Sequence, residues 1–187
     1  ADVLEMQDVE RPAVGETDLL VRVASSGVNR ADLMQRRGRY PAPPGYPQHI
    51  LGLEYAGTVE DVGRRAERFA VGDAVMGITG GGAYAEFVVV SAGTAIAAPP
   101  RMDLLRVGAL PEVFMTAFDA AFAQEGLLRG ETLLVHAVGS GVGTAALQLG
   151  ARAGATVIGT SRTPGKLERA VNLGLEHAVL AEEEIER

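Results

Sequence analysis

The segment from residue 132 to residue 153 constrains the fold of this chain more than any other part of the sequence. Thr132-Leu133-Leu134-Val135-His136-Ala137 is a nearly continuous apolar run, as expected for a strand buried on both faces of a parallel sheet. A glycine-rich turn, Gly139-Ser140-Gly141-Val142-Gly143, follows at once. Thr144 to Ala153 is typical of a helix, which Gly154 ends. Strand, glycine turn and helix in this order open a βαβ unit.

The alternation of strand and helix continues beyond this unit. We expect a second buried strand from Ala155 to Gly159, a second helix from Pro164 to Leu173 ended by Gly174, and a third strand from His177 to Leu180. An acidic cluster, Glu182-Glu183-Glu184, comes after the third strand. This order predicts a parallel sheet with crossover helices.

The first half of the chain differs in its pattern of apolar residues and glycines. Short β-like runs broken by glycines predict a small β-barrel, with strands at Leu19–Ala24, Tyr55–Val62, Asp73–Ile78 and Ala83–Val90. Ala31 to Arg37 is typical of a short helix, capped on its N-terminal side by Asn29. The four prolines between Tyr40 and Pro47 predict an extended loop that displays Tyr40 and Tyr46.

A boundary between two domains is expected near Pro111. Asp103–Leu110 and Val113–Gln124 carry apolar residues at helical spacing, without the alternation of a strand. We therefore assign residues 1–111 to one domain and residues 112–187 to a second.

Composition supports an α/β chain and narrows its partners. Of the 187 residues 47% are hydrophobic, and 24 glycines with 9 prolines favour a turn-rich α/β protein over a helical bundle. A formal net charge of -7 disfavours nucleic acid and anionic membranes as partners. Ala1–Glu10 has no signal-peptide pattern and no apolar run reaches the length of a membrane span, so we expect a cytoplasmic protein.

The residue inventory also narrows the chemistry. The sequence has no cysteine, which removes thiolate nucleophiles and cysteine-bearing zinc sites. His49, His136 and His177 stand far apart, so we expect no metal site. We interpret His136, within the first strand of the βαβ unit, as a core histidine with a hydrogen-bond partner.

The glycine-rich turn is a candidate binding site for a pyrophosphate. Backbone N–H groups and the positive end of the helix dipole face outward together where a strand meets a helix, and glycine lets phosphate oxygens approach the backbone. The G-x-G-x-G pattern departs from the standard G-x-G-x-x-G, so a tight βα turn without a ligand is the alternative. The candidate cofactor-binding residues here are Ala137, Gly139, Ser140, Gly141, Val142 and Gly143.

The end of the second strand indicates which dinucleotide would bind. An NAD enzyme places an acidic residue there for the ribose hydroxyls, whereas this chain has Ser161-Arg162, followed one helical turn later by Lys166. A hydroxyl and two cations suit a 2′-phosphate, so we predict NADPH rather than NADH. The alternative is that Arg162 and Lys166 are solvated surface charges.

Six segments of the chain together carry a resemblance to a known family. They are Gly27–Asp32, Tyr40–Pro44, Leu51–Gly57, Val71–Val75, Gly82–Glu86 and Leu133–Gln148. In these segments the chain resembles the medium-chain dehydrogenase/reductase superfamily and, within it, the zinc-free NADPH:quinone oxidoreductases, including the p53-inducible type. The resemblance covers essentially the whole chain and implies a GroES-like β-barrel catalytic domain in residues 1–111, followed by the first half of a Rossmann domain, a doubly wound parallel sheet, in residues 112–187.

The resemblance also implies roles for single residues. In the zinc enzymes of the superfamily a cysteine matches Asn29 and a histidine matches Leu53, so this chain lacks both zinc ligands and alcohol dehydrogenation is disfavoured. Glu54 remains from that motif, and we expect it to order its loop through hydrogen bonds.

Three residues are implied as catalytic. Asn29 would hydrogen-bond a quinone carbonyl, or serve only as a helix cap. Tyr40 would form one side of a binding site for an aromatic substrate, or would only pack against its own loop. Thr116 would lie beside the cofactor at a helix start, or be a buried hydroxyl bonded to its own helix. In many relatives a tyrosine lies near the adenosine 2′-phosphate, and Ala181 stands at that position here. The distinction between NADPH and NADH is then left to Ser161, Arg162 and Lys166.

The resemblance thus implies an enzyme, an NADPH-dependent oxidoreductase that transfers hydride to quinones or activated carbonyl substrates without zinc. The alternatives are an enal or enoyl reductase and a crystallin-like protein that binds NADPH with little catalysis. Measured against the family pattern, the chain lacks the first strand and the second Rossmann half. We therefore expect an open apolar sheet edge after the third strand, and a homodimer for the full-length protein.

Overall fold

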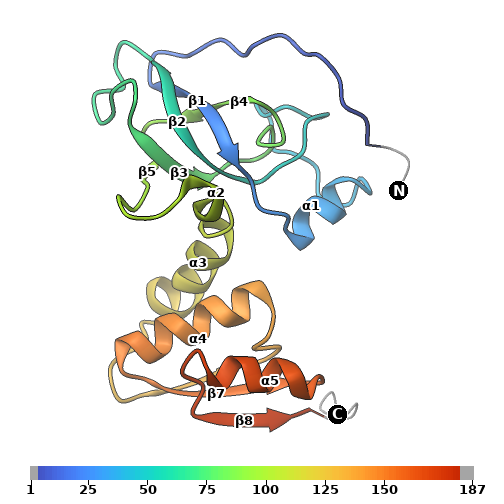
Figure 1. The fold of residues 1–187 in the computed structure, drawn as a ribbon, viewed down its shortest axis with the longest axis vertical. Helices are drawn as coiled ribbons and strands as arrows, with labels where there is room; N and C mark the ends of the chain where they lie inside the picture. Colours follow the sequence, from blue (N-terminus) through green and yellow to red (C-terminus); the bar gives the residue numbers. More distant parts are fainter. Residues whose placement is uncertain (1–3, 182–187) are drawn as a thin grey trace. The chain divides into compact units, whose positions relative to one another are not determined.

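A computed structural model describes residues 4–181 (Figure 1). The chain divides into two compact units, Ala1–Glu112 and Val113–Arg187. Within residues 4–181, no helix combines the length and the apolar character needed to cross a membrane.

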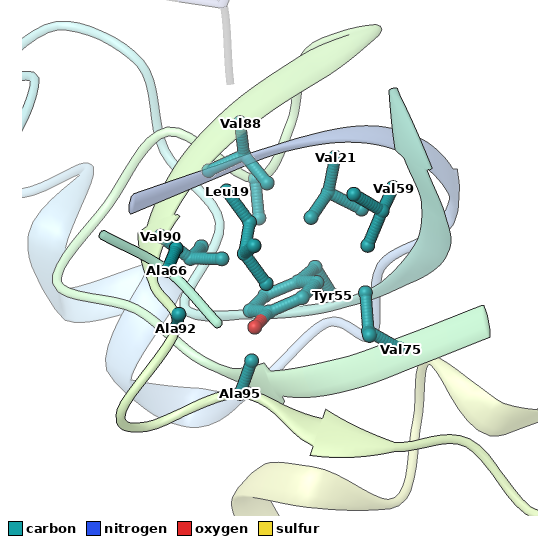
Figure 2. Packing of buried hydrophobic residues seen from close by; sticks show 11 residues of the cluster. Leu19, Val21, Tyr55, Val59, Ala66, Val75, Val88, Val90, Ala92 and Ala95 are labelled. Atoms are coloured by element: carbon teal, nitrogen blue, oxygen red, sulfur yellow. The ribbon is translucent and has the colours of Figure 1, made fainter. Parts of the chain in front are cut away.

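The first unit is built on an antiparallel sheet whose strands wrap around one apolar core. Alternate residues of its strands point inward, so Leu19, Val21, Tyr55, Val75 and Val88 meet in the core (Figure 2). The order in the sheet is β4-β1-β2-β3-β5, with bounds β1 Asp18–Ser25, β2 Glu54–Val62, β3 Ala74–Ile78, β4 Phe87–Ser91 and β5 Ile96–Ala97.

The helices between residues 30 and 124 are short. Helix α1 spans Arg30–Gln35 and begins after Asn29, as the sequence predicted. Helix α2 spans Leu104–Val107, and the Asp103 side chain caps it by accepting a hydrogen bond from the Leu105 N–H at 3.0 Å. Helix α3 spans Pro111–Phe118 and continues into a π-helix, η1, at Asp119–Gln124.

The second unit contains a parallel sheet in the order β6-β7-β8. Its strands are β6 at Thr132–Val135, β7 at Thr156–Ser161 and β8 at His177–Leu180, joined by α4 at Gly141–Ala153 and α5 at Pro164–Val171 (Figure 1). Val135 and Val157 from the sheet, Leu147 from α4 and Leu167 from α5 share one apolar cluster. The strand–helix alternation confirms the predicted parallel sheet, and Val179 and Leu180 are exposed on its edge strand β8.

Strand β6 differs from the prediction. It ends at Val135 rather than Ala137, and it is not buried on both faces, since 53% of Leu134 is exposed. The physical reason is that alternate side chains face opposite sides of the sheet: Leu133 and Val135 pack in one cluster with Leu147 of α4, whereas Leu134 faces the other side. His136 follows the strand and is exposed, so the predicted core position was wrong, whereas the expected hydrogen-bond partner is present, since its Nδ1 lies 3.1 Å from the Thr160 Oγ1.

Two other expectations need correction. The strand predicted from Ala83 begins only at Phe87, because the Ala83 and Tyr84 N–H groups bond to the carbonyls of Gly52 and Leu51 instead of a strand partner. The helix predicted over Val113–Gln124 changes to π-helical geometry at Asp119. The acidic cluster Glu182–Glu184 lies outside the described residues.

Candidate functional site

The glycine-rich turn occupies the junction of β6 and α4. Ser140 is the N-cap residue of α4, and its Oγ accepts a hydrogen bond from the Gly143 N–H at 3.1 Å. Ala137 has a φ of 51°, the left-handed region that non-glycine residues rarely adopt. Ser140, Gly141 and Val142 are exposed at the helix start. The Ser140 N–H donates to the Ala137 carbonyl at 2.8 Å, so the N–H groups that suit a phosphate anion are those of Gly141 and Val142 in the first turn of α4.

Gly143 and Gly139 show why this turn requires glycine. A Cβ on buried Gly143 would lie 2.5 Å from the Ala137 carbonyl oxygen and 2.8 Å from the Val138 Cα, so the residue lets α4 begin directly against the turn. A Cβ on Gly139 would lie 2.7 Å from the Lys166 Cβ and 2.8 Å from its Cδ. The aliphatic stem of Lys166 therefore lies against the glycine-rich turn.

The end of β7 lies beside this turn. In the parallel pairing Val135 is opposite Gly159, and the Val138 N–H donates to the Thr160 carbonyl at 2.9 Å. The carboxyl ends of β6 and β7 thus form one edge, where a doubly wound sheet binds its ligands. The structure brings together the predicted cofactor-binding groups at this edge.

The side chains after β7 differ in availability. Ser161 is buried, and its Oγ accepts from the Thr163 N–H at 3.1 Å, so the hydroxyl shapes the turn into α5. Arg162 and Lys166 are exposed and form no ion pair within residues 4–181. Two cations are therefore available at this edge for an anionic ligand.

Thr116 occupies a different place from the one predicted. It is the sixth residue of α3 rather than a residue at the helix start, and its side chain is exposed rather than buried. Ala117, the next residue along the chain, and Ala121 of η1 help to line a hollow of about 400 Å³ beside Leu133 and Leu134 of β6. His136 also lines this hollow, and its Nδ1 lies 3.1 Å from the Thr160 Oγ1.

In the first unit, Asn29 lies at the centre of a network of buried carboxyl groups. Its side-chain Nδ2 donates to the Glu54 Oε1 at 2.7 Å, and its backbone N–H donates to the Asp32 Oδ2 at 2.7 Å. The second Glu54 oxygen, Oε2, accepts from the backbone N–H of Glu112 at 2.9 Å. Glu54 is 1% exposed and Asp32 is 2% exposed. The structure thus confirms Asn29 as the residue that caps α1 and Glu54 as a residue that orders its surroundings.

Burial sets the electrostatics of this network. Desolvation raises the pKa of Glu54, while the hydrogen bonds from the Glu112 N–H and from Asn29 lower it and the charge of Asp32 raises it. The pKa of Glu112 is raised by desolvation and by the charges of Glu54 and Asp32. Desolvation and the nearby Asp32 also raise the pKa of Tyr84, whose hydroxyl donates to the Gly27 carbonyl at 3.2 Å.

Asp32 and Tyr84 belong to this network, and the sequence interpretation did not single them out. A signal for Asp32 was present, because an acidic residue three positions after an N-cap Asn is the spacing of a capping box. For Tyr84 no local signal exists, since its contact with Gly27 spans 57 positions of sequence.

The proline-rich loop exposes both of its tyrosines, as predicted. Tyr40 is 46% exposed and Tyr46 is 42% exposed. The Tyr46 ring packs on the backbone of Gly80, where an added Cβ would lie 2.7 Å from its Cδ2. Within the described residues no hydrogen bond joins Tyr40 to Asn29.

Comparison with known proteins decides the family. Residues 15–100 match the alcohol dehydrogenase GroES-like domain. A quinone oxidoreductase of Pseudomonas aeruginosa is 37% identical over 170 residues, which are 90% of this chain and 52% of that protein. The structure of a quinone oxidoreductase from Pseudomonas syringae pv. Tomato DC3000 superposes with a TM-score of 0.86 at 34% identity, over 96% of this chain and 55% of that one.

Residues 15–100 therefore belong to the alcohol dehydrogenase GroES-like domain family. The CurK enoyl reductase is also similar to the chain, with a TM-score of 0.83 and 28% identity over 92% of this chain and 54% of that one. The chain therefore spans about half the length of these relatives.

The family assignment confirms the fold class expected from the sequence. The antiparallel sheet of residues 18–97 falls within the GroES-like match, and the parallel sheet β6-β7-β8 is the start of a Rossmann arrangement. Within residues 4–181, no group of three or more His, Asp or Glu side chains is arranged to hold a metal ion.

Proposed function

We propose that this protein is an NADPH-dependent oxidoreductase that reduces quinones without zinc. The observation that carries the proposal is the edge formed by β6 and β7, where an N-capped glycine turn, the stem of Lys166 and the exposed Arg162 occur together. Quinone oxidoreductases are among the proteins that this chain resembles over most of its length.

The residues of the second unit fit the dinucleotide. We assign the pyrophosphate to Ala137, Gly139 and the N–H groups at the start of α4, where Gly141 and Val142 are exposed. We assign the 2′-phosphate to Arg162 and Lys166, beside the turn formed by Ser161. When bound, the nicotinamide supplies a hydride, and the quinone, the hydride and one proton together give the hydroquinone.

Asn29, Tyr40 and Thr116 are proposed to act on the substrate. Asn29 has a second Nδ2 hydrogen besides the one donated to Glu54, and we assign that hydrogen to the quinone oxygen on which negative charge develops. Tyr40 offers an exposed aromatic ring as a wall for a flat substrate, and Thr116 offers an exposed hydroxyl on α3.

The residues at the family's zinc positions support chemistry without zinc. Asn29 already uses its amide nitrogen as a donor to Glu54, and Leu53 is a buried apolar side chain that cannot ligate a metal. Polarisation of the substrate by hydrogen bonds then takes the place of a Lewis acid.

Reduction of an activated carbon–carbon double bond is the second candidate function, because the CurK enoyl reductase is similar to the chain over 92% of its length. The test is turnover with NADPH on a small ortho-quinone and on an α,β-unsaturated ketone. Quinone reduction predicts activity on the first and little on the second, and the reverse result would assign the protein to the enoyl reductases.

A further inference from the structure

The carboxylate of Glu54 joins three separate segments of the first unit. It stands at the first residue of β2, accepts from the Asn29 side chain just before α1, and accepts from the Glu112 N–H in the first turn of α3. The residue before α3, Leu110, has no polar side chain, so Glu54 supplies the helix cap from a distant part of the sequence. The side chain packs against Gly27, where a Cβ would collide with Oε1.

Among residues 4–181, no cation is one of the groups that shift the pKa of Glu54. Asp32 contributes a second buried carboxyl, and its Oδ1 has no hydrogen-bond partner in the described part of the chain. Glu112 and the Tyr84 hydroxyl are the other titratable groups that act on this site, and neither brings a positive charge at neutral pH. Two buried carboxyl groups without a compensating cation among the described residues are costly, so we expect a role that outweighs their cost.

That role follows from the chemistry of the Asn29 amide. An ionised carboxylate only accepts hydrogen bonds, so it requires the Nδ2 of Asn29, rather than the Oδ1, to face Glu54. Asp32 fixes the backbone of the same residue through the Asn29 N–H. Because the backbone and the side-chain amide of Asn29 are both held, the remaining Nδ2 hydrogen points in one direction, as a preorganised donor requires.

We propose that Glu54 is the positioning residue for Asn29, and that its ionised carboxylate sets the direction of the amide hydrogen offered to the substrate. This inference rests on the proposed function for its effect on turnover. The contact between Glu54 and Asn29 itself does not depend on which substrate is reduced.

The kinetic test compares Glu54→Gln with Glu67→Gln, an exposed residue that serves as the control for loss of one charge. Two donors, the Asn29 Nδ2 and the Glu112 backbone N–H, now point at the two oxygens of Glu54. Glutamine presents one oxygen and one NH2 group in their place. Because the backbone N–H is fixed in α3, we expect the Asn29 amide to turn. We expect kcat for quinone reduction to fall about 10- to 100-fold with little change in KM, less than the roughly 100- to 1,000-fold cost of removing a preorganised donor, because the Asn29 amide is turned and not removed. Glu67→Gln retains the wild-type kcat.

A double-mutant cycle separates positioning from general loosening of the fold. If Glu54 acts through Asn29, then Glu54→Gln has less than about a threefold effect on kcat in an Asn29→Ala background. Full additivity of the two losses would overturn the proposal and leave Glu54 as a structural cap of α3. In the wild type, kcat should fall at low pH as Glu54 becomes protonated, and this pH dependence should disappear in Glu54→Gln.

A spectroscopic measurement tests the contact without any turnover. In ¹⁵N-labelled wild-type protein, the Asn29 side-chain amide resonance, assigned by its loss in Asn29→Ala, should shift as the Glu54 carboxyl titrates between about pH 4 and 8. A resonance that does not move over this range overturns the proposal, even if Glu54→Gln does not fold. If the resonance titrates but the protein reduces no quinone, the proposed function fails while the positioning of Asn29 by Glu54 stands.

Discussion

Gly143→Ala tests whether the glycine turn needs its close contact between helix and backbone. The new Cβ would lie 2.5 Å from the Ala137 oxygen and 2.8 Å from the Val138 Cα, and both neighbours are backbone atoms that cannot rotate away. Overpacking of this kind costs about 1–3 kcal/mol, whereas alanine gains up to about 1 kcal/mol over glycine inside a helix. We therefore expect a net loss of about 0.5–2 kcal/mol in the free energy of unfolding.

The chain offers a matched control for this substitution. Gly165 also lies in a helix, the second residue of α5, and a Cβ there would meet no atom within 4 Å. Gly165→Ala should raise the free energy of unfolding by about 0.5–1 kcal/mol. Urea unfolding followed by circular dichroism measures both variants, and NADPH titration of Gly143→Ala should show about tenfold weaker binding. A Gly143→Ala protein as stable as Gly165→Ala would refute the close contact.

Three further predictions concern other parts of the chain. Replacing Arg162 and Lys166 by alanine should weaken NADPH far more than NADH, by about 1.5–3 kcal/mol for each lost charge-assisted bond, and equal losses would disprove the 2′-phosphate assignment. Tyr55→Phe removes a buried hydroxyl without a partner in the described residues, so the free energy of unfolding should stay level or rise by up to about 1 kcal/mol, and a large loss would reveal a hidden partner. The raised pKa of Glu54 means that the folded state binds the proton more tightly than the unfolded state. The free energy of unfolding of the wild type, relative to that of Glu54→Gln, should therefore fall as the pH rises from about 4 to 7. A rise over this range would contradict the assigned direction of the pKa shift.

Local sequence signals predicted the elements that local interactions determine. The third strand was placed at His177–Leu180, where β8 occurs, and Asn29 was predicted to cap the helix that begins at Arg30. Both depend on capping and periodicity within a few residues. The glycine cluster likewise marked the strand-to-helix junction before α4.

Features that depend on distant residues were not predictable in this way. The exposure of Leu134 depends on which elements cover β6, and an apolar run carries no information about its neighbours. The network around Glu54 joins Asn29, 25 positions away, with Glu112, 58 positions away. Only the fold brings these polar groups to one place.

The central claim is that the edge formed by β6 and β7 binds NADPH. Titration of the purified protein with NADPH and with NADH, followed by nicotinamide fluorescence, tests it most directly. We predict saturable NADPH binding that is at least tenfold tighter than NADH binding, the difference expected from one charge-assisted contact to a phosphate. Equal affinities, or no binding of either dinucleotide, would contradict the claim.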